Sequence, residues 1–102
     1  MIGEFEYFVL AAAAHCGDEA YGVSFRNMIE QTAGRPCSIG ALYTTLDRLE
    51  AKGLIRTRLG EAIAERGGRA KRLVKLTAQG RRAGKEFESA IAKISRGLLW
   101  NT

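Results

Sequence analysis

Residues 38–59 have the sequence SIGALYTTLDRLEAKGLIRTRL, and this stretch decides the fold. Its apolar positions first repeat at the spacing of one buried helix face, at Ile39, Leu42, Leu46 and Leu49. Ser38 precedes the pattern as a good N-cap, and Gly53 follows it, as glycine often does just past a helix C-terminus. From Leu54 onward polar and apolar side chains alternate, which is typical of a half-buried strand. The stretch therefore predicts a helix that leads directly into a β-strand.

The residues after this strand predict a β-hairpin. Residues 71–77 alternate in the same way and form the returning strand. The connection between the strands is too long for a tight turn, and it contains Gly67 and Gly68. Further helices are expected over residues 3–15, over residues 21–34, and from residue 78 to about residue 97, the last with Thr77 as its N-cap. A helix followed by a hairpin is the order of a winged helix-turn-helix, so we expect a mainly α fold with a two-stranded β-wing.

The charge of the chain is distributed unevenly. Residues 1–47 hold two basic and six acidic side chains, a net charge of −4, whereas residues 48–102 hold fourteen basic and five acidic ones, a net charge of +9. The two parts together give the net charge of +5. Such asymmetry, with much of the positive charge on a protruding hairpin, favours a polyanionic partner, and we expect double-stranded DNA.

The helix over residues 38–52 is the expected reader of that DNA. In helix-turn-helix proteins the N-terminal residues of the second helix reach base edges in the major groove. The candidate contacts on this helix are Ser38, Gly40, Ala41, Tyr43, Thr44 and Arg48. Gly40 and Ala41 are small, which lets the backbone approach DNA closely. Tyr43 has an equally good alternative role as a half-buried aromatic residue between helices.

The hairpin supplies the second set of candidate DNA contacts: Arg66, Arg69, Lys71 and Arg72. Basic wing residues usually bind phosphates or enter the minor groove. The alternative for these residues is a charged hairpin that is simply solvated.

The last helix has an apolar seam whose residues are four, three and four positions apart, as in a heptad repeat. The seam packs either on the first helix of the same chain or across a two-fold axis. We favour a homodimer, because a chain of 102 residues has little core left to cover a long fourth helix. The candidate interface residues are Phe5, Phe8, Phe87, Ile91, Ile94, Leu98 and Trp100. We therefore expect residues 1–77 to form a winged helix-turn-helix DNA-binding domain and residues 78–102 a C-terminal dimerisation helix, together one compact unit.

Other classes of protein are disfavoured by the residues present. His15 is the only histidine, and no nucleophile–base arrangement or phosphate-binding loop is visible, so we expect no enzyme and no cofactor. Cys16 and Cys37 are expected to be structural thiols, and together with His15 they are too few for a zinc site. No apolar run approaches the length of a membrane span and the start does not resemble a secretory signal, so we expect a cytoplasmic protein.

Taken together, these motifs resemble the PadR family of bacterial winged-helix transcriptional regulators, in its type with a short, single C-terminal helix. The resemblance rests on short motifs in a fixed order: residues 3–6, Val9-Leu10, Tyr21-Gly22, residues 40–43, Leu46, residues 48–50 and 52–55, residues 67–69, Lys71-Arg72, and Leu76-Thr77 with Gly80. One departure is Leu73-Val74, where the family often has two aromatic residues.

The resemblance implies a homodimer in which the C-terminal helix packs against the partner's N-terminal and C-terminal helices. It also implies repression of transcription at a palindromic operator, relieved by a small aromatic or phenolic effector near the dimer interface. For DNA contact it implies Ser38, Gly40, Tyr43, Thr44, Arg69 and Lys71. Two alternatives stay open: a winged-helix adaptor that binds proteins, and a non-specific DNA-binding protein without effector control.

Overall fold

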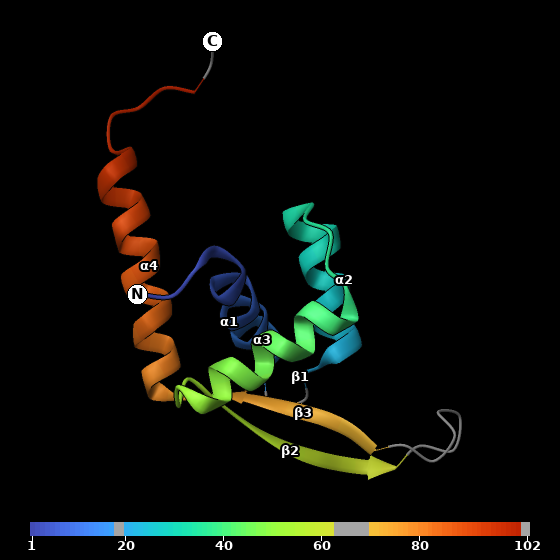
Figure 1. Ribbon diagram of the computed structural model, residues 1–102. Coiled ribbons are helices and arrows are strands. Elements are labelled where there is room, and N and C mark those ends of the chain that lie inside the picture. The colour runs from blue at the N-terminus through green and yellow to red at the C-terminus, as the bar shows by residue number, and fades with distance from the viewer. Residues whose placement is uncertain (18–19, 63–69, 101–102) are drawn as a thin grey trace.

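The structure is a computed structural model that describes residues 1–17, 20–62 and 70–100. Its elements in chain order are α1 (Glu4–Cys16), β1 (Ala20–Tyr21), α2 (Gly22–Ala33), α3 (Ile39–Ala51), β2 (Ile55–Ala62), β3 (Ala70–Leu76) and α4 (Ala78–Ser95). The helices α1, α2 and α3 gather on one side of the sheet, and α4 stands beside them (Figure 1). The predicted order of helices and hairpin is confirmed.

The ends of α3 and α4 follow from local capping. The Ser38 hydroxyl oxygen accepts a hydrogen bond from the Ala41 N–H at 3.1 Å, and the Thr77 hydroxyl oxygen accepts one from the Gly80 N–H at 3.0 Å. Gly53 has a φ of 77°, which a residue with a side chain rarely adopts, and it stops α3 before β2 begins. The predicted N-caps Ser38 and Thr77 are confirmed.

The sheet has three strands in the order β1-β3-β2, all antiparallel. In the hairpin Ile55 pairs with Leu76 and Thr57 pairs with Val74. The third strand, β1, differs from the sequence-based expectation: the pattern predicts Tyr21 at the start of the second helix, but Tyr21 pairs with Leu73 of β3. Two residues are too few to show a periodic pattern, so this strand is visible only through its tertiary pairing.

The core lies between the three helices and the inner face of the sheet. Its fully buried side chains come from every layer: Val9, Leu10, Phe25, Leu42, Leu46, Leu49, Ile55 and Val74. Two apolar positions differ from the predicted pattern, since Ile39 is only half-buried and Leu59 is 73% exposed. Leu59 is opposite Arg72 in the hairpin, where the side chain from β3 is charged and pairs with carboxylates of α3 instead of extending the apolar core.

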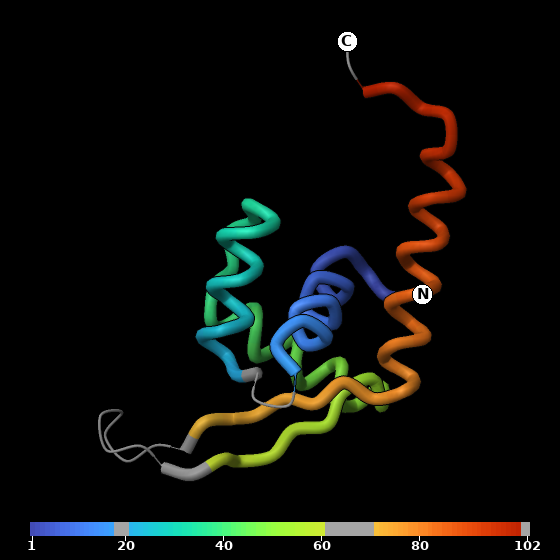
Figure 2. Tube along the Cα trace, turned by 180° about the vertical axis from the view of Figure 1, so that it is seen from behind, coloured from blue at the N-terminus to red at the C-terminus, as the bar shows by residue number. Residues whose placement is uncertain are grey.

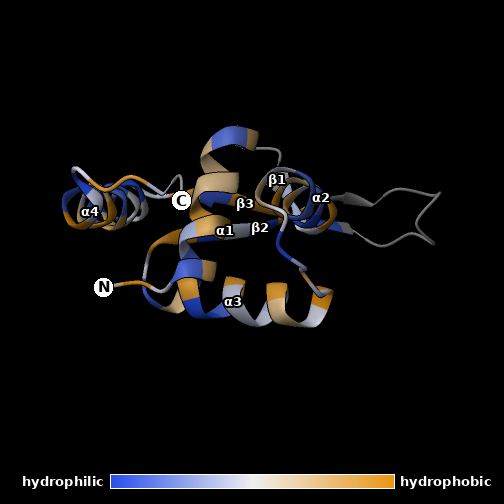
Figure 3. Cartoon of the chain, turned by 90° about the horizontal axis from the view of Figure 1, so that it is seen from above, coloured by the Kyte–Doolittle hydropathy of each residue, from blue (hydrophilic) through white to orange (hydrophobic). Residues whose placement is uncertain are grey.

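Helix α4 is attached to the body from its start to its middle. The Phe87 ring stacks on Tyr7 of α1, with ring centroids 4.8 Å apart, and the Tyr7 hydroxyl donates a hydrogen bond to Glu88 at 3.2 Å. The last turns of the helix and the residues after it extend beyond the other helices (Figures 1 and 2). Seen from above, α4 lies at one end of the molecule, and β2 and β3 extend away from it toward the other end (Figures 1 and 3).

Candidate nucleic-acid interface

The exposed face of α3 collects all six candidate DNA contacts of that helix. Ser38, Gly40, Ala41, Tyr43, Thr44 and Arg48 are exposed, while Leu42, Thr45, Leu46 and Leu49 form the buried face. The first turn of α3 contains no acidic side chain, so the positive end of the helix dipole is not neutralised there. This end of the helix is suited to an anion such as a DNA phosphate.

Tyr43 is partly covered by α2, as the alternative role considered from the sequence requires. Its side chain is 37% exposed, yet its hydroxyl group lies against Gly22 at the start of α2. A Cβ atom at Gly22 would come within 2.6 Å of the Tyr43 oxygen, so the glycine leaves the space that the ring occupies. Tyr43 is therefore held between helices while part of its ring stays open to a ligand. Its contact with DNA remains a prediction.

The two wing residues that the structure describes, Lys71 and Arg72, have different surroundings. The Lys71 ammonium group lies 4.2 Å from the centre of the Tyr21 ring, which is a cation–π contact. The side chain of Arg72 is 22% exposed and is paired with carboxylates of α3. The other two predicted wing contacts, Arg66 and Arg69, lie outside the described residues.

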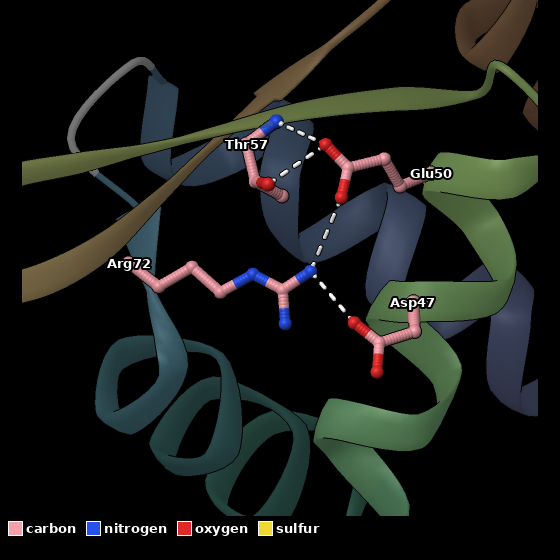
Figure 4. Close-up of polar contacts among 4 residues, drawn as sticks. All are labelled: Asp47, Glu50, Thr57 and Arg72. Carbon is pink, nitrogen blue, oxygen red and sulfur yellow. Dashed lines mark hydrogen bonds and ion pairs between the residues drawn. The ribbon is translucent and has the colours of Figure 1, made fainter.

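Arg72 belongs to a polar cluster that the sequence analysis missed (Figure 4). Its Nη2 forms an ion pair with Asp47 Oδ1 at 2.9 Å and donates a hydrogen bond to Glu50 Oε1 at 3.3 Å. Glu50 Oε2 accepts from the Thr57 N–H at 3.0 Å and from the Thr57 hydroxyl at 2.7 Å. The Thr57 hydroxyl bond lowers the pKa of the Glu50 carboxyl; burial opposes this, but the Thr57 N–H and Arg72 bring the net shift downward.

A second group of basic side chains lies on the outer face of the hairpin. Arg56, Arg58 and Lys75 are exposed, and Arg56 is directly opposite Lys75 in the strand register. Together with Leu73 they line a shallow hollow of about 430 Å³. Within the described part of the chain none of these three cations forms an ion pair, so the hairpin is positively charged on this face as well.

The candidate dimer residues fall into two sets. Phe5 and Phe8 are half-buried beneath the Arg35 guanidinium, and Phe87 is half-buried on Tyr7. The other set is exposed: Ile91, Ile94, Leu98 and Trp100, with Leu99 beside them. Between α1 and α4 the surface has a groove of about 340 Å³, which includes Tyr7, Ala11 and Gly84.

Neither the cysteines nor the acidic residues form a reactive or metal-binding site in residues 1–17, 20–62 and 70–100. No group of His, Cys, Asp or Glu side chains in these ranges is placed to hold a metal ion. Cys16 and Cys37 are both free thiols. Burial and the nearby Glu30 carboxylate raise the pKa of the Cys37 thiol, which makes its reactive thiolate form scarcer. In the same ranges no helix has the length and apolar character required to cross a bilayer.

A helix-turn-helix followed by a β-hairpin, with an exposed helix face beside basic strands, defines a winged-helix DNA-binding fold. Residues 9–86 match the transcriptional regulator PadR-like family. The chain belongs to this family, and it is a transcriptional regulator rather than an enzyme. The predicted family and fold class are thus confirmed. No protein with a curated description matches the sequence.

Solved structures with the same fold include transcriptional regulators and a further winged-helix DNA-binding protein. A transcriptional regulator from Clostridium thermocellum superimposes with a TM-score of 0.74 and 19% identity, over 89% of this chain and 85% of that one. A PadR family transcription regulator from Clostridium difficile gives 0.73 and 18%, over 91% and 95% of the two chains. A winged-helix DNA-binding protein from STIV gives 0.72 and 22%, over 91% and 92%. At these low sequence identities, the similarity to the three structures shows a shared fold alone.

Proposed function

We propose that this protein is a cytoplasmic, homodimeric repressor that binds a specific DNA sequence. Its α3 enters the major groove and its wing contacts the adjacent phosphates or minor groove. The observation that carries the proposal is the exposed, acid-free N-terminal end of α3 beside a positively charged hairpin. The contact residues are Ser38, Gly40, Ala41, Tyr43, Thr44 and Arg48 on the helix, and Arg66, Arg69 and Lys71 on the wing. Residues 1–77 bind DNA, and residues 78–102 join the two protomers.

The homodimer is supported by the exposed apolar side chains of α4 and of the residues that follow it. Ile94 is 82% exposed, and Leu99 and Trp100 are each 81% exposed in the single protomer. Burying one such side chain stabilises an assembly by about 1.5–3 kcal/mol, so a chain with several of them in a row gains much from a partner. A second copy carries the same seam, and the two seams cover each other when the copies are related by a two-fold axis.

Two-fold symmetry determines the form of the DNA site. Each protomer presents one α3, so the matching operator is palindromic, with half-sites about one DNA turn apart. The α4 seam lies at the end of the molecule away from the wing hairpin (Figure 3). A dimer joined through α4 therefore has its two wings at the outer ends.

We further propose that a small aromatic effector controls DNA binding. The apolar surface near the seam offers Phe5, Phe8, Phe87, Ile91 and Trp100, and the α1–α4 groove lies beside Tyr7 and Phe87. An effector bound there would contact the elements that join the protomers. The competing role for these side chains is to fill the interface alone.

The first test is a fluorescence-anisotropy titration at near-physiological salt. It compares DNA from upstream of the protein's own gene with a scrambled duplex of equal length. Tight binding to the upstream DNA alone supports a specific, self-regulating repressor. Equal affinity for both duplexes leaves a non-specific binder or an operator elsewhere, and binding to neither favours the adaptor.

A control variant tests the placement of α3 on DNA. Thr44→Ala changes the exposed face of α3, and Thr32→Ala makes the same change at an exposed site near the end of α2. We expect only the first to weaken specific binding. Equal effects of the two variants would contradict the placement.

A further inference from the structure

We propose that Arg72 does not contact DNA but is a positioning residue, which holds the wing at a set angle to α3. This inference rests on the proposed function, and it changes the role that the sequence suggests for Arg72. It starts from the side-chain direction: the guanidinium points back toward α3, where Asp47 and Glu50 receive it (Figure 4).

Arg72 contacts α3 along two turns of one helix face. Its Nη2 lies 2.9 Å from Asp47 and 3.3 Å from Glu50, and its guanidinium carbon is 5.9 Å from the centre of the Tyr43 ring. Residues 43, 47 and 50 are four and three positions apart, which is the spacing of neighbours on a helix surface. One side chain of β3 is thus fastened to the same helix that is proposed to read the bases.

Glu50 extends this attachment to the other strand of the hairpin. Its second oxygen accepts two hydrogen bonds from Thr57 of β2, at 3.0 and 2.7 Å. The cluster therefore joins α3, β2 and β3 at once. Arg72 pairs with Leu59, four residues along β2 from the pair of Ile55 with Leu76, so the attachment lies partway along the hairpin toward the wing.

The charges of the cluster argue against a phosphate contact. Asp47 and Glu50 carry two negative charges, and Arg72 neutralises only one of them. A phosphate that approached Arg72 would meet a group with a net charge of −1, and it would have to compete with two carboxylates already bound. Arg72 thus fixes the wing and is not free to neutralise a phosphate.

Salt dependence distinguishes this role from a direct contact. The probe is a duplex that the wild-type protein selects from a random-sequence pool, titrated at several salt concentrations. We expect Arg72→Gln to weaken binding by about tenfold, as when one member of a coupled pair is removed, with an unchanged slope of log affinity against log salt. If Arg72 neutralised a phosphate, the substitution would instead make that slope shallower by about 0.9, and this result would overturn the proposal.

A double-mutant cycle with Glu50→Gln gives a second test, because the two roles considered for Arg72 predict opposite effects of this substitution on DNA affinity. If Glu50 and Arg72 act together to hold the wing, Glu50→Gln weakens binding more in the wild-type background than in the Arg72→Gln background. If Arg72 were a phosphate ligand restrained by Glu50, Glu50→Gln would release it and strengthen binding most in the wild-type background. In the Arg72→Gln background, the change in DNA affinity caused by Glu50→Gln gives the effect of removing one negative charge alone.

A charge-neutral variant removes electrostatics from the comparison. Thr57→Val deletes the hydroxyl that holds Glu50, and Thr32→Val makes the same change at an exposed position of α2. We expect Thr57→Val alone to weaken binding, in the same direction as Arg72→Gln. Unaltered affinity in the Thr57 and Arg72 variants would overturn the positioning role and leave the proposed function intact. A wild-type protein that selects no duplex would overturn the proposed function, and the role of Arg72 with it.

Discussion

Gly80 of α4 lies directly against the backbone carbonyl of Leu54: a Cβ atom at residue 80 would be 2.1 Å from the Leu54 oxygen. With α4 packed in this way, no side chain larger than a hydrogen atom fits at residue 80. The sequence alone suggests that a glycine here weakens the helix, and the structure shows what the glycine permits, which is the close approach of α4 to the start of β2.

This close approach gives a prediction with a matched control on the same helix. We expect Gly80→Ala to destabilise the protein by about 1–3 kcal/mol, because a backbone carbonyl cannot move aside as a flexible side chain can. A Cβ atom at Gly84 would have no neighbouring atom within 4 Å, so Gly84→Ala should stabilise the protein by about 0.4–1 kcal/mol. Thermal unfolding of both variants checks the pair, and a stable Gly80→Ala protein would contradict the packing described.

The α4 seam gives a prediction about assembly. Ile94 is 82% exposed in one protomer, so Ile94→Asp should leave the fold intact while placing a charge in the proposed interface. We expect sedimentation to show monomers for Ile94→Asp. Ala92→Asp adds the same charge to an exposed position outside the seam and should remain dimeric. Dimers that persist in Ile94→Asp would remove the seam from the interface.

Acid should weaken the fold through Glu6, a buried carboxylate that joins α1 to the end of α3. Burial raises the pKa of Glu6, but hydrogen bonds from Lys52 at 2.7 Å and from the Gly3 N–H at 2.9 Å, with the charges of Lys52 and Arg48, lower it overall. A carboxyl whose pKa is lower in the folded state stabilises the fold above its unfolded value, 4.5 for Glu6, and this contribution is lost as the pH falls through the folded pKa.

The measurement is thermal unfolding from neutral pH down to about pH 3, which spans the ordinary carboxyl pKa range. We expect Glu6→Gln to lower stability at neutral pH and to show a smaller further loss in acid than the wild-type protein. Glu86→Gln, at an exposed site of α4, should behave like the wild type. Parallel acid profiles for the Glu6 variant and the wild type would show that this carboxylate does not contribute.

Lys71 should show the signature of a phosphate contact that Arg72 lacks. Its ammonium group lies over the Tyr21 ring, and a cation–π contact leaves the charge available to an anion. We expect Lys71→Gln to make the salt slope of DNA binding shallower by about 0.9, the value for one phosphate that is no longer neutralised. Lys93→Gln, in the last turn of α4 at the other end of the molecule, should leave the slope unchanged. A slope that does not respond to Lys71 would exclude it from the interface.

The parts of this fold that the sequence predicts well are those determined by near neighbours. Ser38, Gly53 and Thr77 mark helix boundaries through interactions with residues one to four positions away, and all three act as predicted. The buried face of α3 is equally local, because three leucines at helical spacing must share one side.

The parts that sequence reasoning misses depend on contacts between distant residues. Arg72 is predicted as a DNA contact because basic wing residues usually are, but the positions of Asp47 and Glu50 beside it follow from the strand register and the packing of α3 on the sheet. The spacing of Asp47 and Glu50 on one helix face is the only signal in the sequence, and it does not identify a partner. β1 is missed for the same reason, because its two residues form a strand only where β3 accepts them.

Thr77 makes the arrangement of α4 depend on the end of α3. Its hydroxyl caps α4 through the Gly80 N–H, and it also donates to the Gly53 carbonyl at 2.8 Å, while its own N–H donates to the Leu54 carbonyl at 3.2 Å. The start of the proposed dimerisation helix and the end of the proposed base-reading helix are therefore held on one residue. In a dimer built on α4, the distance between the two α3 helices depends on the geometry of the contacts of Thr77 in each protomer. A small tilt of α4 at Thr77 would change the length of operator that the pair can span.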